Sequence, residues 1–272
     1  MRSIVSVINM ATAVMALIVA ATGCATADAG NVGIPVGCQS RFLGLELKPN
    51  SAVQLLVAAG NTVPKGAWSD YRDLALHVVR CTGADATLAL RPINARSFSE
   101  RALSTETVPS RMGRNSINPL HYRVDMHAFI TRQTAQIDRL EAYPNPLDWS
   151  DPVGGLLAAS DSLRHAPADV KRVVVMVMNG YEQTAEFNTF VFGVDPVTFA
   201  GPVLRKLREK SALPQLAGVD VVILGITQGA VGMHATTTQA AGVCRFWSKI
   251  VTAGKGNLVY CDAGLPDASR SD

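Results

Sequence analysis

Polar side chains follow the apolar runs that predict strands, and they are the residues best placed to do chemistry. Because the carboxyl ends of parallel strands meet at one edge of a doubly wound sheet, we expect these side chains to share a crevice there. The predicted ligand face consists of Thr62, Ser150, Asn179, Tyr181, Glu182 and Thr227. Neutral donors and acceptors with one carboxylate favour a protein-binding face. The alternative is that the crevice is vestigial and that recognition lies elsewhere.

Motifs for catalysis are weak. The sequence has no G-x-S-x-G element, so a hydrolase has no nucleophile to name. The glycine-rich turn from Ala59 to Gly66 matches neither G-x-x-x-x-G-K-[ST] nor G-x-G-x-x-G. Enzyme activity therefore stays open but is the less favoured hypothesis.

Apolar strand-like runs alternate with helical stripes through most of the chain. The strongest run, Val173 to Met178, is apolar on both faces, as in a central strand of a covered parallel sheet. The alternation predicts an α/β fold with a doubly wound, mostly parallel central sheet and helices on both faces. Predicted strands cover 53–58, 86–90, 173–178, 219–224 and 258–261, and predicted helices cover 68–80, 119–142, 153–163, 202–210 and 236–251.

A single domain should span residues 51–272. No linker divides this region. The polar stretch from Asn94 to Asn118 has no clear periodicity, so it predicts a long loop or insertion at about 94–118.

Four segments resemble the von Willebrand factor A family, and together they cover most of residues 53–261. They are Leu55 to Val63, Trp149 to Leu156, Val173 to Glu182, and Gly218 to Gly225 with the later pair Phe246 and Trp247. The last segment is similar to actinobacterial members of the family. The resemblance implies a Rossmann-like domain that binds proteins.

The family's metal-ion-dependent adhesion site implies a bound Mg²⁺, but the matching positions here have changed. Ala58 stands where the first Asp is expected and Gly60 where the first Ser is expected. Thr62 and Ser150 keep hydroxyls, while Asn179 replaces the second Asp. Because Mg²⁺ is usually held by one or two carboxylates, we expect a degenerate site and no cofactor.

A metal-dependent alternative remains, because two carboxylates lie near the altered positions. Mg²⁺ could be held by Thr62, Ser150, Asp151 and Glu182. The chain would then be a divalent-metal-dependent adhesin, or an enzyme that uses Asp151 and Glu182.

The N-terminus resembles a bacterial lipoprotein leader. Arg2 precedes an apolar stretch from Ile4 to Ala21, and small residues lead up to Cys24. We expect residues 1–23 to be a signal peptide, Cys24 to carry the lipid, and residues 24–50 to be a tether and lead-in. The protein would then sit on the extracytoplasmic face of the cell membrane. Cleavage near Ala25 to Ala27 would instead give a secreted protein, and no cleavage would leave a membrane anchor.

The remaining four cysteines agree with export. Outside the cytoplasm they suggest two disulfides with three possible connectivities, and we favour Cys38 with Cys261 and Cys81 with Cys244.

Charge and composition restrict the partner. Residues are 48% hydrophobic and 17% charged, which predicts a well-buried core. The formal net charge of +3 is too small to indicate nucleic-acid binding. We expect the partner to be an unidentified envelope or extracellular protein.

Overall fold

The computed structural model describes residues 50–60, 63, 65–110, 119–145, 147, 149–189, 191, 193–226 and 237–265. The predicted leader, Cys24, Cys38, Thr62 and Thr227 lie outside these residues. None of the helices described has the length and apolar character needed to cross a membrane.

Six strands form one sheet in the order β3-β2-β1-β4-β5-β6. They are β1 (Ala52–Ala58), β2 (Thr87–Ile93), β3 (Ser104–Thr107), β4 (Arg172–Val177), β5 (Val219–Leu224) and β6 (Asn257–Asp262). All neighbours pair in parallel except β2 and β3, which are antiparallel. The predicted mostly parallel α/β architecture is therefore confirmed. From β1, the chain adds β2 and β3 on one side and β4, β5 and β6 on the other, so the strand order reverses between β1 and β4.

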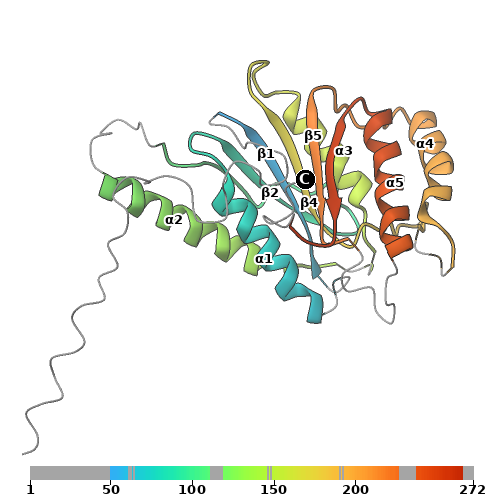
Figure 1. Cartoon of the computed structure of the whole chain (residues 1–272), viewed down its shortest axis with the longest axis horizontal. Helices are drawn as coiled ribbons and strands as arrows, with labels where there is room; N and C mark the ends of the chain where they lie inside the picture. Colours follow the sequence, from blue (N-terminus) through green and yellow to red (C-terminus); the bar gives the residue numbers. More distant parts are fainter. Residues whose placement is uncertain are drawn as a thin grey trace, which may run out of the picture. The chain divides into compact units, whose positions relative to one another are not determined.

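Helices connect the parallel strands. They are α1 (Lys65–Cys81), α2 (Pro119–Asp138), α3 (Pro152–Leu163), α4 (Ala200–Glu209) and α5 (Thr237–Ala253), with a short 3₁₀ helix η3 (Pro196–Phe199) before α4. Figure 1 shows α1 and α2 side by side, with α3, α4 and α5 beyond the strands from them. Each predicted helix is present, and the bounds differ from those predicted by a few residues.

The strand register shows that α3 and α5 cover the same face of the sheet. Side chains of paired residues in parallel strands point to the same face. The paired residues along one row are Leu56, Met176, Ile223 and Cys261. A Cβ on Gly155 of α3 would lie 2.9 Å from a methyl carbon of Leu56, and Cys244 of α5 is bonded to Cys261. Part of the core is thus packed between this pair of helices and the strands, and buried residues of α1 and α2 supply another part.

The predicted loop at 94–118 contains an edge strand. Residues Ser104–Thr107 form β3, whose Glu106 accepts hydrogen bonds from Arg132 and Gln133 of α2. The prediction of a loop is therefore wrong for this part, while the insertion at about 94–118 stays a prediction. A sequence of Ser, Thr and Glu lacks the apolar alternation of a half-buried strand, because its side chains contact polar groups of α2 or solvent.

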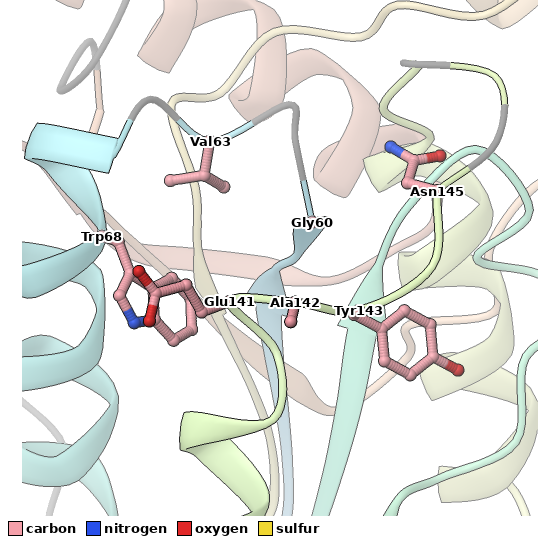
Figure 2. A pocket seen from close by; sticks show the side chains of 7 residues that line it. All are labelled: Gly60, Val63, Trp68, Glu141, Ala142, Tyr143 and Asn145. Carbon is pink, nitrogen blue, oxygen red and sulfur yellow. The ribbon is translucent and has the colours of Figure 1, made fainter.

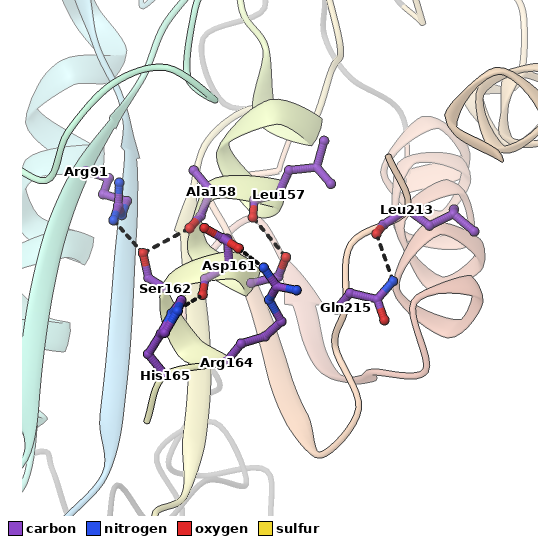
Figure 3. A network of polar contacts seen from close by, with 10 residues as sticks. Arg91, Leu157, Ala158, Asp161, Ser162, Arg164, His165, Leu213 and Gln215 are labelled. Atoms are coloured by element: carbon purple, nitrogen blue, oxygen red, sulfur yellow. Dashed lines mark hydrogen bonds and ion pairs between the residues drawn. The ribbon is translucent and has the colours of Figure 1, made fainter. Parts of the chain in front are cut away.

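Arg91 of β2 connects its strand to the neighbouring strand β1 and to helix α3. Its guanidinium donates to Gln54 Oε1 of β1 (3.0 Å), to the Glu100 carbonyl (3.1 Å) and to Ser162 Oγ of α3 (2.6 Å). Figure 3 shows the arginine reaching Ser162 next to the network around Asp161. Burial lowers the pKa of Arg91. The hydrogen bonds offset the cost of placing a charge inside the sheet.

The disulfides differ from the favoured pairing. Cys244 is bonded to Cys261, with 5.7 Å between their Cα atoms. Cys81 is also in a disulfide, and its partner lies outside the described residues. Both favoured pairings, Cys38 with Cys261 and Cys81 with Cys244, are therefore wrong. Cys81 and Cys244 lie on α1 and α5, which cover different faces of the sheet. The observed bond links a helix to the strand that follows it.

Candidate functional site

The loops after β2 and β4 meet the start of α3 at the carboxyl edge of the sheet. The Asp151 N–H donates to the Asn94 carbonyl after β2 (2.9 Å). Ser150 and Gln183, which follows β4, exchange two backbone hydrogen bonds of 2.9 and 2.8 Å. The structure thus brings Ser150, Asp151 and Glu182 together.

Asp151 and Glu182 both bind the first turn of α3. Asp151 Oδ1 accepts a hydrogen bond from the Gly154 N–H at 2.7 Å. Glu182 Oε2 accepts one from the Val153 N–H at 3.0 Å. The first N–H groups of a helix have no partner within the helix and attract negative charge. These two carboxyl groups therefore act as caps of α3.

The close approach of the two carboxyl groups changes their titration. Burial raises the pKa of Asp151 to about 6. Glu182 is 1% exposed, and burial together with the charge of Asp151 raises its pKa. Two neighbouring carboxylates resist double ionisation, so the pair favours holding a proton between them.

Asn179 and Tyr181 stabilise the loop after β4. Asn179 Oδ1 accepts a hydrogen bond from the Tyr181 N–H (3.1 Å), and Tyr181 is only 4% exposed. Burial raises the pKa of Tyr181. Trp247 of α5 donates its indole N–H to the Gly180 carbonyl at 2.7 Å. Two residues of the predicted ligand face are thus used within the protein, since Asn179 bonds its own loop and Tyr181 is buried.

At the end of β1 the chain segment after α2 occupies the space next to Gly60. Gly60 has a φ of +73°, and its N–H donates to the Leu140 carbonyl (2.9 Å). A Cβ at this position would lie 2.6 Å from the Tyr143 carbonyl oxygen. Only glycine fits both the left-handed backbone and this close approach.

A cavity of about 360 Å³ lies beside Gly60. Its lining consists of Gly60, Val63, Trp68, Glu141, Ala142, Tyr143 and Asn145. Figure 2 shows that it lies between the start of α1 and the segment after α2. We call it the β1 pocket. Sequence reasoning missed it, and the only relevant signal is the group of prolines from residue 144 onward, which predicts an irregular segment there.

Exposed apolar side chains are concentrated in loops near the same edge. Among the residues described, six large apolar side chains are exposed, and Val124 is the one within a long helix. The other five are Phe98, Leu147, Trp149, Val191 and Val194, which we call the apolar loop group. The Asp151 N–H donates to the Asn94 carbonyl of the loop that carries Phe98 (2.9 Å), and Asn145 Nδ2 donates to the Trp149 carbonyl at 2.9 Å. These loops are therefore tied to the start of α3.

Donors for a metal ion are sparse here. Across the described ranges, no three His, Cys, Asp or Glu side chains come together in a group that could hold a metal ion. Ala58 offers a methyl group, and Asn179 Oδ1 already accepts a backbone hydrogen bond.

Comparison with known proteins finds structural likeness only. No protein-family model and no curated protein matches the chain. The solved structure of BatB from Bacteroides thetaiotaomicron is 14% identical, with a TM-score of 0.37, covering 78% of this chain and 90% of BatB. The open form of the pilus adhesin SpaC from Lactobacillus rhamnosus GG is 10% identical, with a TM-score of 0.40, covering 79% of this chain and 28% of the adhesin. A second form of SpaC is 9% identical, with a TM-score of 0.42 and the same coverage. The fold assignment therefore depends on the sheet topology itself.

Proposed function

We propose that this chain is a protein-binding module of the von Willebrand factor A type. In this proposal a lipid on Cys24 holds it at the extracytoplasmic face of the cell membrane. Its partner is an envelope or extracellular protein that binds the carboxyl edge of the sheet. The observation that carries the proposal is the position of the apolar loop group, since exposed apolar side chains grouped on loops are typical of protein interaction sites.

The loops that carry this group are held on a rigid frame. Ser150 and Gln183 form a backbone bridge, and the Glu182 N–H donates to Thr189 Oγ1 at 2.8 Å. Trp149 lies one residue before Ser150 of this bridge, and Val191 lies two residues after Thr189. Loops fixed in this way lose less conformational entropy when a partner binds.

We further propose that binding is independent of divalent metal and that the module is not catalytic. Mg²⁺ prefers carboxylate ligands in octahedral geometry. The two carboxyl groups nearest the altered metal positions accept hydrogen bonds from the first turn of α3, so a metal would have to displace these caps. Neither Ala58 nor Gly60 supplies a side-chain oxygen.

A photo-crosslinking experiment tests the binding face. A benzophenone amino acid replaces Trp149 in the full-length protein in its own cells, and a matched variant carries it at Val124 on α2. We expect a discrete crosslinked protein from position 149, unchanged by EDTA, and none from position 124. Equal crosslinking at both positions contradicts the proposed face, and loss of the crosslink in EDTA supports the metal-dependent alternative with Asp151 and Glu182.

The lipid anchor has its own test. Cys24→Ser removes the thiol that would be acylated, so we expect the protein to leave the membrane fraction or to keep its leader uncut. The measurement is fractionation with mass spectrometry of the N-terminus. Wild-type protein found free in the medium would indicate secretion, and a wild-type chain that keeps residues 1–23 in the membrane would indicate an uncleaved anchor.

A further inference from the structure

We propose that the β1 pocket binds a basic side chain, lysine or arginine, of the partner protein. This inference deepens the proposed function and rests on it. It assigns the chemistry of one contact within the binding face.

The charged group that lines the pocket favours a positively charged ligand. Among the described residues that line the cavity, Glu141 is the one carboxylate, and none is a lysine, arginine or histidine. Within the described part of the chain, the Glu141 carboxylate forms neither an ion pair nor a hydrogen bond. Because a cation close to an unpaired carboxylate is attracted and an anion is repelled, the pocket disfavours phosphate or carboxylate ligands.

The walls of the pocket suit the stem of a basic side chain. Trp68 and Val63 line the cavity and are 6% and 8% exposed, so they are held in place by the core. Figure 2 shows Trp68 on α1 and Val63 on the loop before it, with the Glu141 side chain extending in this view from the segment after α2 toward Trp68. An indole ring attracts a nearby ammonium or guanidinium group, and apolar walls pack against an aliphatic stem. The volume of about 360 Å³ lies within the range of small-ligand sites.

The polar groups deeper in the lining are already used within the protein. The Tyr143 hydroxyl donates to Glu100 Oε2 at 3.0 Å. Asn145 Oδ1 accepts a hydrogen bond from the Ala95 N–H (3.2 Å), while its Nδ2 donates to Trp149. Glu141 is therefore the group in the lining that is best able to select a charged ligand.

The position of the pocket favours a partner protein as the source of the cation. The pocket lies at the end of β1, where the strand order reverses and doubly wound sheets tend to bind ligands. Asn145 links its wall to Trp149 of the apolar loop group. A protein lying across that group would thus reach the pocket with a neighbouring side chain.

Binding of small analogues tests the chemistry directly. The probe is N-acetyl-lysine methylamide, titrated into the full-length chain in detergent while the indole N–H signals are followed by NMR. The norleucine analogue keeps the stem without the charge, and the glutamate analogue reverses the charge. We expect a Kd on the order of 1–10 mM for the lysine analogue, as for a single contact, and weakening by added salt. Equal binding of the norleucine or glutamate analogue overturns the proposal.

A matched pair of variants locates the charge. Glu141→Gln should weaken binding of the lysine analogue at least fivefold. Glu209→Gln, at the exposed end of α4, should leave it unchanged. An unchanged Kd for Glu141→Gln contradicts the assignment.

The same variants separate this inference from the proposed function. If position 149 crosslinks to a partner equally well in wild type and in Glu141→Gln, the binding face stands and the inference fails. If position 149 gives no crosslink while the lysine analogue binds through Glu141, the pocket stands as a site for a free amine and the proposed partner contact fails.

Discussion

The ends of β1 and β4 lie next to each other at one edge of the sheet, yet they are built in different ways. After β4, Tyr181 and Glu182 pack inward, and Trp247 of α5 closes the loop through the Gly180 carbonyl. After β1, a glycine meets the backbone at Tyr143, and a cavity remains open beside it. One end is filled by its own side chains, and the other leaves room for a ligand.

This difference shows that the groups around a carboxylate determine whether it can bind a ligand. Asp151 and Glu182 are near the positions that resemble a metal site, but they bind the N–H groups of α3. Glu141 lies in a segment that matches no motif, and its carboxylate is unpaired within the described residues and faces the pocket. Each capping carboxylate uses one oxygen on α3, and the other oxygen of Glu182 is buried without a hydrogen-bond partner. The unpaired carboxylate of Glu141 instead lines the pocket, where a cation can reach it.

The largest expected effect comes from Gly60→Ser, which would restore the hydroxyl of the family's metal site. A φ of +73° costs a non-glycine residue about 1–2 kcal/mol, and a Cβ 2.6 Å from the Tyr143 oxygen requires the backbone to move. We expect a loss of about 3–4 kcal/mol in the free energy of unfolding, measured by chemical denaturation, and no gain of Mg²⁺ binding.

The matched control for this change is Gly66→Ser at the start of α1. A Cβ there meets no atom within 4 Å, so we expect a change of less than about 0.5 kcal/mol. Similar losses in both variants would mean that the contact between Gly60 and Tyr143 does not restrict the end of β1.

The strands and helices could be predicted because their signal is local. The run Val173 to Met178 is apolar on both faces, and the structure buries it in the middle of the sheet. Ser104–Thr107 carried no such signal, because an edge strand that contacts polar groups of α2 needs no apolar residues. The mostly parallel pairing followed from the alternation of elements, whereas the disulfide pairing depended on which helix covers which face.

The site was harder to predict, because the position of a residue in the sequence does not say where its side chain points. Tyr181 follows a strand and was expected on an open face, but it packs against the core. The β1 pocket joins residues near 60–68 with residues 141–145, and the contact between them comes from the path of the chain after α2. Thr62 and Thr227 lie outside the described residues, so their part in the ligand face stays a prediction.

A smaller effect is expected at the end of β4 from Trp247→Phe. The variant removes the indole N–H that donates to the buried Gly180 carbonyl, and an unsatisfied buried acceptor costs about 1–3 kcal/mol. We expect a loss of about 2 kcal/mol by chemical denaturation. The control, Trp149→Phe, changes a side chain that is 39% exposed and should alter stability by less than about 0.5 kcal/mol. An equal loss in both would show that the closure of this loop does not depend on the indole bond.

The smallest effect, and one of opposite sign, is expected for Glu182→Gln. The amide keeps an oxygen for the Val153 N–H and removes the like charge beside Asp151. Because the folded pKa values of both acids are raised, folding favours their protonated forms. Wild type should therefore lose stability as pH rises from about 4 through the pKa of Asp151 near 6. The variant should be more stable at pH 8, by on the order of 1 kcal/mol, with a flatter profile between pH 5 and pH 8.

The control for this last change is Glu186→Gln, in the same loop. Hydrogen bonding to Lys210 lowers the pKa of Glu186, so its contribution to stability is present above its unfolded pKa and is lost as pH falls. The charge of Glu186 is the smallest of the causes acting on the pKa of Asp151, so removing it should leave most of the decline toward pH 8 in place. Removing the charge of Glu182 should reduce the decline more. If Glu182→Gln lowers stability at pH 8 and keeps the wild-type profile, the carboxylate of Glu182 is needed in its charged form. The loop after β4 would then contain a charged carboxylate, as the segment beside the end of β1 does. The two strand ends would no longer differ in this respect.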